Sequence, residues 1–236
     1  MKTVVTINIR HGGGTTDRVD ALVTRMLGYD ADMLVVSEFR ANANGARLQA
    51  ALERSGYATS HPVAAPRQNS VLIASRWPIE RSWAFSQTLE SHHLWCAATT
   101  EMAICGVYMP QGAAKVSYWE SLIQHGVGSG IDLFIGDFNT GNNDLDKDPG
   151  GTKFYGPELP GRFIGTGYID IWRARHPRTR EYSWFSPTKA NNGFRLDHAY
   201  ARPGLNERVV SCEFDHTPRL LNETDHSALI VSIASD

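Results

Sequence analysis

The stretch Asp132-Leu-Phe-Ile-Gly-Asp-Phe-Asn139 is a short apolar run that leads directly into an acid, Asp137, and an amide, Asn139. An apolar run of this length, followed by glycine and polar residues, predicts a buried strand. Earlier in the chain, Met33-Leu-Val-Val36 leads in the same way toward Glu38. Two buried strands that each end in a carboxylate predict a sheet with acidic side chains along one rim.

Strand and helix patterns alternate in the first half of the chain, and strand patterns dominate the second half. Strands are predicted within 4–9, 33–36, 71–74, 96–107 (two strands), 132–135, 194–201 and 227–233. Helices are predicted from the spacing of apolar residues within 19–27, 48–52 and 116–123. Residues 141–161 are rich in Gly, Pro, Asn and Asp and predict a long loop, a kind of segment that is often functional. Residues 1–236 are therefore predicted to form one mixed α/β domain.

Composition limits the function classes. Of 236 residues, 42% are hydrophobic and 20% charged, which predicts a packed core and not a disordered chain. The formal net charge of −2 gives no general attraction to nucleic acid, so a nucleic-acid contact needs a local basic patch or a metal ion. Three cysteines, with no C-x-x-C pair, predict reduced thiols. The absence of a signal-peptide pattern and of a membrane-spanning run predicts a cytoplasmic protein, with a monomer as the default expectation.

Polar or ionisable side chains fall where several predicted strands meet loops. They are Asn8, Glu38, Asp137, Asn139, Asp197, Asp225 and His226. If the strands share a sheet, these side chains converge at one rim. Carboxylate and amide oxygens favour hard cations such as Mg²⁺ or Mn²⁺, and a carboxylate beside a histidine can orient the ring. Each residue alone is more often a solvated strand end, so the interpretation depends on the set and its order.

Seven short motifs follow one another along nearly the whole chain, between residues 3 and 233. They are Thr6-Ile-Asn8-Ile-Arg10, Val35-Val-Ser-Glu38, Gly106-Val-Tyr108-Met-Pro110-Gln111-Gly112, Gly136-Asp137-Phe-Asn139, Gly167-Tyr-Ile-Asp170-Ile-Trp172-Arg173, Arg195-Leu-Asp197-His198 and Thr224-Asp225-His226-Ser227. In this order they resemble the endonuclease/exonuclease/phosphatase superfamily. The resemblance implies a four-layer α/β sandwich, with two mixed β-sheets packed face to face and helices outside. It also implies a divalent-metal-dependent hydrolysis of phosphodiester bonds by in-line attack of water.

The resemblance assigns roles around a metal ion. Glu38 resembles the family's principal ligand for Mg²⁺ or Mn²⁺, with Asn8 in support. Asp225 is implied either to bind the metal directly or to contact the residues that bind it. Asp137 is implied to take the proton from the attacking water, while Asn139 holds the geometry.

The remaining implied roles concern the phosphate. His226 is implied to donate hydrogen bonds to the phosphoryl oxygens, with Asp197 fixing its tautomer and orientation. Tyr108 is implied to hydrogen-bond the phosphate or the leaving group. The chain departs from the family pattern at Arg10, where AP (apurinic) endonucleases carry Asp or Asn. The resemblance therefore does not extend to this second metal-linked position.

Two segments resemble the exonuclease III type of AP endonuclease in particular: 108–112, and 182–185 followed by 192–197. That resemblance implies DNA as the substrate and an apolar wall for a flipped abasic sugar. The wall residues would be Trp184, Phe194 and Leu196, for which ordinary core packing is the alternative. The near-neutral charge and short connections favour a second hypothesis, a phosphatase or phosphodiesterase that acts on a smaller or lipid-linked phosphoester. A third is a non-catalytic binding module.

A compact basic run, Arg173-Ala-Arg175-His-Pro-Arg178-Thr-Arg180, precedes the aromatic residues of the second segment. Basic residues beside aromatic ones suit contact with a phosphate backbone and with bases or sugars. We therefore expect substrate contacts from Arg173, Arg175 and Arg178. The alternative is a solvated helix end and turn in which these side chains serve only the structure.

Overall fold

The computed structural model describes residues 1–235. Its strands are β1 (Lys2–Asn8), β2 (Met33–Phe39), β3 (Ala58–Ser60), β4 (Ser70–Ser75), β5 (Arg81–Ala84), β6 (Leu94–Ala98), β7 (Ala103–Tyr108), β8 (Leu133–Asp137), β9 (Ile169–Asp170), β10 (Trp184–Phe185), β11 (Gly193–Phe194), β12 (Asp197–Ala201), β13 (Val209–Asp215) and β14 (Ala228–Ile233). Its helices are α1 (Thr16–Gly28), α2 (Ala43–Arg54), α3 (Lys115–His125), α4 (Leu159–Ile164), α5 (Ile171–Arg175), α6 (Pro203–Asn206) and α7 (Thr217–Leu220), with short 3₁₀ turns η1 (Gly112–Ala114) and η2 (Val127–Ser129).

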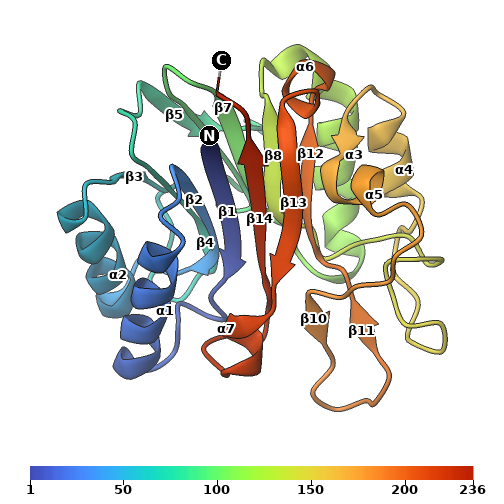
Figure 1. The fold of residues 1–236 in the computed structure, drawn as a ribbon, viewed down its shortest axis with the longest axis horizontal. Coiled ribbons are helices and arrows are strands. Elements are labelled where there is room, and N and C mark those ends of the chain that lie inside the picture. The colour runs from blue at the N-terminus through green and yellow to red at the C-terminus, as the bar shows by residue number, and fades with distance from the viewer. Residues whose placement is uncertain (236) are drawn as a thin grey trace.

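Two mixed six-stranded sheets form the centre of the molecule. Their strand orders are β13-β14-β1-β2-β4-β3 and β5-β6-β7-β8-β12-β9, and β10 and β11 form a separate hairpin. Figure 1 shows the helices α1 and α2 on the outer side of the first sheet and α3, α4 and α5 on the side of the second. The predicted four-layer α/β sandwich is confirmed.

Three apolar clusters hold these layers together. The first lies between the sheets and includes Val35 and Ile73 from one sheet and Ile104 and Ile135 from the other. The second joins the first sheet to α1 and α2, and the third joins the second sheet to α3 and α4. The sheets approach closely at Gly106, where an added Cβ would lie 2.5 Å from a Val71 methyl group. Each fully buried aliphatic side chain contributes about 1.5–3 kcal/mol, so this packing fixes the sheets against each other.

The polar strand ends meet at one rim because parallel strands end together within each sheet and the two sheets pack face to face, and not because the strands share a single sheet as expected. In the first sheet, β1 and β2 are parallel and Asn8 pairs with Ser37, one residue before Glu38. In the second sheet, β7 and β8 are parallel and end together at Tyr108 and Asp137. The antiparallel strand β12 begins where β8 ends, because Asp197 pairs with Asp137.

The single strand predicted within residues 194–201 is wrong in one respect. The structure divides it into β11 and β12, because Arg195 turns inward to a buried ion pair with Asp146 and Asp170. The alternation of apolar residues could not reveal this, since both acids lie far away in the sequence. The division separates Phe194 from β12 and places it on the hairpin with β10.

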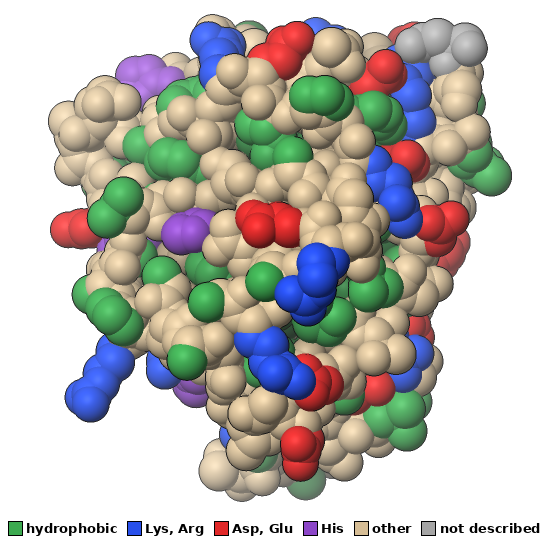
Figure 2. All heavy atoms as spheres, turned by 90° about the vertical axis from the view of Figure 1, so that its left-hand side faces the viewer, with side chains coloured by type: hydrophobic (Ala, Val, Ile, Leu, Met, Phe, Trp, Pro, Cys, Tyr) green, Lys and Arg blue, Asp and Glu red, His purple; other side chains and the backbone are tan. Residues whose placement is uncertain are grey.

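Two observations concern the surface. On the side that carries α1 and α2, Figure 2 shows basic and acidic side chains interspersed, in keeping with the formal net charge of −2. Within residues 1–235, no helix is long and apolar enough to cross a membrane.

Candidate active site

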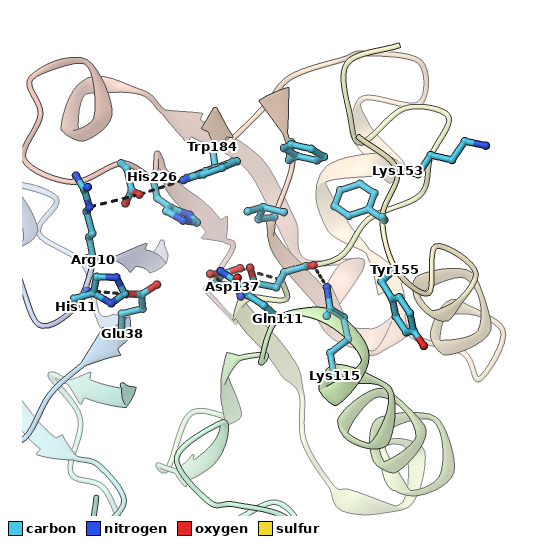
Figure 3. Close-up of a pocket in the computed structure, with 16 residues that line it drawn as sticks. Arg10, His11, Glu38, Gln111, Lys115, Asp137, Lys153, Tyr155, Trp184 and His226 are labelled. Atoms are coloured by element: carbon cyan, nitrogen blue, oxygen red, sulfur yellow. Dashed lines mark hydrogen bonds and ion pairs between the residues drawn. The ribbon is translucent and has the colours of Figure 1, made fainter. Parts of the chain in front are cut away.

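A pocket of about 350 Å³ opens at the rim where the strand ends meet. Its lining comes from segments that are far apart in the sequence, between Arg10 and His226. Figure 3 shows three groups of side chains around it: Arg10, His11 and Glu38 on one side, Asp137 and His226 in the middle, and Lys115, Tyr155 and Lys153 on the other.

Glu38 is held at the pocket by several donors. Its backbone has φ +58°, and the pairing of β2 with β4 shifts register between Ser37 and Phe39, so the side chain leaves the regular strand. Oε2 accepts hydrogen bonds from the His11 backbone N–H (2.7 Å) and from Asn69 Nδ2 (3.0 Å). A non-glycine residue at positive φ costs of the order of 1–3 kcal/mol and persists only where its surroundings require it.

Asn8 joins two carboxylates. Its Nδ2 donates to Glu38 Oε1 (3.1 Å) and to Asp137 Oδ2 (2.9 Å), while its Oδ1 accepts from the Arg10 backbone N–H (2.8 Å). Asn8 is fully buried, so its amide is fixed in this orientation. Asn8 therefore hydrogen-bonds Glu38 directly, and its amide oxygen is bound to the backbone of Arg10. Its support of Glu38 at a metal ion stays a prediction.

Asp137 is buried at 1% exposure and still lines the pocket. Asn139 donates to it from its backbone N–H (2.9 Å to Oδ1) and from Nδ2 (3.3 Å to Oδ2). Burial and the neighbouring Asp197 carboxylate raise the pKa of Asp137, His226 opposes them, and the resulting pKa is about 7. A carboxylate with a pKa near neutrality is suited to accept a proton as a general base.

His226 and Asp197 form the expected pair. The ring Nδ1 lies 2.8 Å from Asp197 Oδ2, which leaves Nε2 as the ring nitrogen available to the pocket. Burial lowers the pKa of His226, but the charges of Asp197, Asp137 and Asp225 outweigh it and raise the pKa to about 10. The imidazole is therefore protonated at neutral pH and able to donate a hydrogen bond to an anion.

Tyr108 lies beside this cluster and not in the lining of the pocket. Its hydroxyl accepts a hydrogen bond from Asn69 Nδ2 (3.1 Å), and the same amide group binds Glu38. Burial, followed by the charge of Glu38, raises the pKa of Tyr108 well above its ordinary value, so the phenol keeps its proton. Tyr108 is thus connected to the carboxylate cluster through Asn69.

The three predicted wall residues all line the pocket. Phe194 and Leu196 are each 8% exposed, and the ring centroids of Trp184 and Phe194 are 5.9 Å apart. Trp184 Nε1 donates to Asp225 Oδ2 (3.1 Å), which also lies 3.8 Å from Arg10 Nε. An apolar wall therefore stands directly beside the charged centre, and Asp225 connects it to Arg10 across the rim.

Contrary to the expectation, the arginines of the basic run 173–180 do not line the pocket. Arg173 donates to the carbonyls of His176 and Thr179 and to Asp146 Oδ1 (2.7 Å). Arg175 donates to the Val209 carbonyl (2.6 Å) and to Asn206.

These placements correct the expected phosphate contacts of Arg173 and Arg175, because their guanidinium groups are used within the chain. Arg180 likewise donates to the carbonyls of Asp144 and Lys147. Arg178 is exposed and does not line the pocket. The alternative reading of the run, a helix end and turn that serve the structure, describes Arg173 and Arg175.

Sequence reasoning missed several contributors to the site, among them Asn69, Lys115 and Phe154. Asn69, which binds Glu38 and Tyr108, precedes β4 directly, so a search for polar residues before as well as after strands could have found it. Lys115 begins α3 at 4% exposure and donates to the Asn139 carbonyl, and burial lowers its pKa to about 8 despite the nearby Asp137. Phe154, from the predicted functional loop, packs on Phe194 at 5.2 Å between ring centroids.

The oxygen donors of the site fit a hard divalent cation. Within residues 1–235, no three acidic, histidine or cysteine side chains are grouped so as to hold a metal ion by themselves. Mg²⁺ is usually bound by one or two carboxylates, and waters and substrate phosphates complete its shell. Glu38, with Asp225 across the rim, matches that pattern, because both carboxylates line the open pocket.

Comparisons with known proteins agree with this architecture. No curated protein sequence matches the chain. The structure is similar to an AP endonuclease from Archaeoglobus fulgidus, with a TM-score of 0.84 and 23% identity over 100% of both chains. It is also similar to the 3′ phosphatase NExo from Neisseria bound to product DNA hairpin, with a TM-score of 0.83 and 18% identity over 100% of both chains. An AP endonuclease from Leishmania major has a TM-score of 0.81 and 18% identity over 100% of this chain and 88% of that one.

At these identities the likeness concerns the fold, and the sequence itself gives the family. Residues 5–236 match the Endonuclease/Exonuclease/phosphatase family, which is nearly the whole chain. The matched range contains each of the strand-end residues that meet at the pocket. We conclude that this chain belongs to the endonuclease/exonuclease/phosphatase family of phosphoester-hydrolysing enzymes.

Proposed function

We propose that this protein is a Mg²⁺- or Mn²⁺-dependent phosphodiesterase that cleaves DNA, with AP endonuclease or 3′-exonuclease activity. One observation carries the proposal: a charged centre of Glu38, Asp137 and His226 shares a pocket with the apolar wall of Trp184 and Phe194. A phosphodiester needs the first, and a sugar taken out of a base stack needs the second. The similarity to solved AP endonucleases supports DNA as the substrate.

In this proposal each side chain has one task. Asp137 accepts the proton of the attacking water, because its raised pKa of about 7 makes it a base near neutral pH. Asn139 holds that carboxylate through two donors. His226 donates from Nε2 to the phosphoryl oxygens as charge develops on them, and Asp197 keeps the ring protonated and oriented.

Other residues hold the phosphate and the cation. Glu38 would bind the cation, with Asp225 near it and Asn8 fixing the direction of Glu38. When bound, such an ion neutralises phosphate charge and stabilises the leaving oxygen. Tyr108 would hydrogen-bond the phosphate or the leaving group through its protonated phenol. The proposal includes a monomer, expected in the cytoplasm. Size-exclusion chromatography with light scattering would measure the oligomeric state.

The test is the incision of defined duplexes. A labelled duplex with one abasic-site analogue and an intact control duplex are incubated with Mg²⁺ or with EDTA, using the wild-type protein and Asp137→Asn. We expect metal-dependent incision at the analogue that Asp137→Asn loses. If neither duplex is cut under any condition, while the same protein hydrolyses other phosphoesters, DNA cleavage is excluded.

A second candidate is the hydrolysis of a smaller phosphoester, including a lipid-linked one. The net charge of −2 and the mixed charges seen in Figure 2 favour it, because a long polyanion gains little from such a surface. Bis-p-nitrophenyl phosphate and a 3′-phosphorylated DNA hairpin distinguish the two. Hydrolysis of bis-p-nitrophenyl phosphate alone would indicate a small-molecule substrate. Hydrolysis of the hairpin would indicate that DNA with a terminal phosphate is the substrate.

A further inference from the structure

The carboxylate of Asp197 has little of its own to hold it in place. Oδ2 lies 2.8 Å from His226 Nδ1. In the part of the chain that the structure describes, the other oxygen, Oδ1, is buried without a hydrogen-bond partner. The position of the carboxylate therefore depends on the backbone that carries it, at the first residue of β12.

That end of β12 has a strand on one side only. Asp197 pairs with Asp137 of β8, whereas β9 on the other side reaches only Tyr200 and Ala201. In place of a strand, the fully buried hydroxyl of Ser183 accepts two successive backbone N–H groups, from Leu196 (3.0 Å) and Asp197 (3.2 Å). Buried backbone N–H groups are nearly always hydrogen-bonded. Ser183 Oγ therefore provides the acceptor that a neighbouring strand would otherwise provide.

The same residue also contacts the other member of the pair. The Ser183 carbonyl accepts a hydrogen bond from the backbone N–H of Ser227 (2.8 Å), the residue after His226. The next residue, Trp184, forms an antiparallel bridge with His226 itself. Ser183 is thus bonded on one side to the segment that carries Asp197 and on the other to the segment that carries His226.

A second set of contacts, between side chains, also links Ser227 to the segment that contains Ser183. Ser227 Oγ lies 2.7 Å from Nδ1 of His216, and His216 Nε2 lies 2.9 Å from Glu181 Oε1. Glu181 belongs to the same short segment as Ser183. This segment is therefore tied twice to the start of β14, once through backbone and once through side chains.

We propose that Ser183 is a positioning residue that sets the distance between Asp197 and His226, and so aims the imidazole at the reacting phosphate. The proposal rests on the proposed function, in which His226 is the donor to the phosphoryl oxygens. A displacement of about 1 Å in such a group is able to cost about 10²-fold in rate. Ser183 itself does not line the pocket, and its hydroxyl acts through the backbone N–H groups of Leu196 and Asp197 that it binds.

The first test compares Ser183→Ala with a matched control, Ser75→Ala. Ser75 is also fully buried and accepts one backbone N–H, from Trp77 (3.0 Å), but it lies at the end of β4 away from Glu38. With bis-p-nitrophenyl phosphate, we expect Ser183→Ala to lower kcat by about 10–100-fold at a KM within about twofold. Ser75→Ala should lower the unfolding temperature and keep kcat, and Ser183→Thr, which retains the hydroxyl, should restore most of kcat.

The second test does not depend on activity. The proton between Asp197 and His226 should give a strongly downfield ¹H NMR signal, identified by its loss in His226→Gln. We expect this signal to shift or broaden in Ser183→Ala and to stay in place in Ser75→Ala. If Ser183→Ala folds too poorly, Ser183→Cys, which has the same connectivity with a slightly larger atom and accepts hydrogen bonds weakly, gives the same comparison.

The outcomes distinguish a failure of the proposal for Ser183 from a failure of the proposed function. An unchanged signal and unchanged kcat in Ser183→Ala, with only a lower unfolding temperature, would show that Ser183 is a packing residue and overturn the proposal. A wild-type protein that hydrolyses no phosphoester would refute the proposed function. In that case the NMR comparison would still decide whether Ser183 sets the geometry of the pair.

Discussion

Replacing Asp170 by Asn tests how the end of β12 is anchored. Arg195, only two residues before Asp197, is 1% exposed. It donates two hydrogen bonds to Asp170 (Nη1 to Oδ1, 3.1 Å; Nη2 to Oδ2, 2.7 Å) and one to Asp146 Oδ1 (2.8 Å). Asp170→Asn keeps the shape of the side chain but removes the negative charge that faces the buried guanidinium.

The magnitude follows from this geometry. Removing one partner of a buried ion pair lowers the free energy of unfolding by about 3–5 kcal/mol, because a charge remains without compensation. Asp146 stays in contact with Arg195, so we expect a value near the lower end, about 3 kcal/mol. For a chain of this length, each kcal/mol lowers the unfolding temperature by about 2–4 °C, which gives a decrease of about 6–12 °C.

The effect should depend on pH in a defined direction. Burial acts to raise the pKa of Asp170, but the charge of Arg195 and the hydrogen bonds from His198 and Arg195 outweigh it and hold the pKa well below its ordinary value. A group whose pKa is lowered by folding stabilises the protein above its unfolded pKa of about 3.9 and loses that contribution as the pH falls. The difference between wild type and Asp170→Asn should be constant from about pH 6 to 8 and narrow below about pH 4.

Thermal and urea unfolding followed by circular dichroism measure the effect. The control is Glu120→Gln, which removes a carboxylate that binds both Nη atoms of Arg162 (2.5 and 2.9 Å) at the surface between α3 and α4. Exposed pairs contribute little, so Glu120→Gln should behave almost like wild type. If Asp170→Asn unfolds at the same temperature as Glu120→Gln, the argument from an uncompensated buried charge is refuted.

Three further predictions concern the pocket. His226→Ala should lower kcat on a phosphodiester by about 10²–10³-fold, because it removes one donor to the developing charge, and steady-state kinetics with wild-type turnover would contradict the proposed role. Glu38→Gln should weaken Mn²⁺ binding measured by isothermal titration calorimetry, while Asn69→Asp, which adds a carboxylate beside Glu38, should strengthen it. Trp184→Ala should raise KM for an abasic-site duplex and leave KM for bis-p-nitrophenyl phosphate unchanged; an equal rise for both substrates would remove Trp184 from the DNA contact.

Much of the site could be read from the chain because its residues follow local patterns. Apolar runs that end in Glu38 and Asp137 indicate buried strands with a polar end. The two strands lie in different sheets, and the face-to-face packing of the sheets brings those ends together. Trp184, Phe194 and Leu196 were expected at the pocket and do line it. Their contact with substrate stays a prediction.

The basic run shows why local patterns were not sufficient. Sequence places Arg173 and Arg175 close together beside aromatic residues, a composition that suits phosphate binding. In the fold, however, the partners of their guanidinium groups are Asp146, Asn206 and the Val209 carbonyl, which come from a loop, the end of α6 and β13. The direction of a long side chain depends on acceptors that only tertiary packing supplies.

The sequence alone was sufficient for the family and for the residues at the ends of β1, β2 and β8, because apolar runs and the residues that end them are local patterns. It did not reveal β13 or the order of the strands in the two sheets. Tertiary contacts were needed to show that Arg195 divides the predicted strand, that Asn69 and Lys115 belong to the site, and that Ser183 joins the segments of Asp197 and His226. These contacts link residues far apart in the chain, and their geometry is set by how the two sheets pack and not by any pattern that neighbouring residues display.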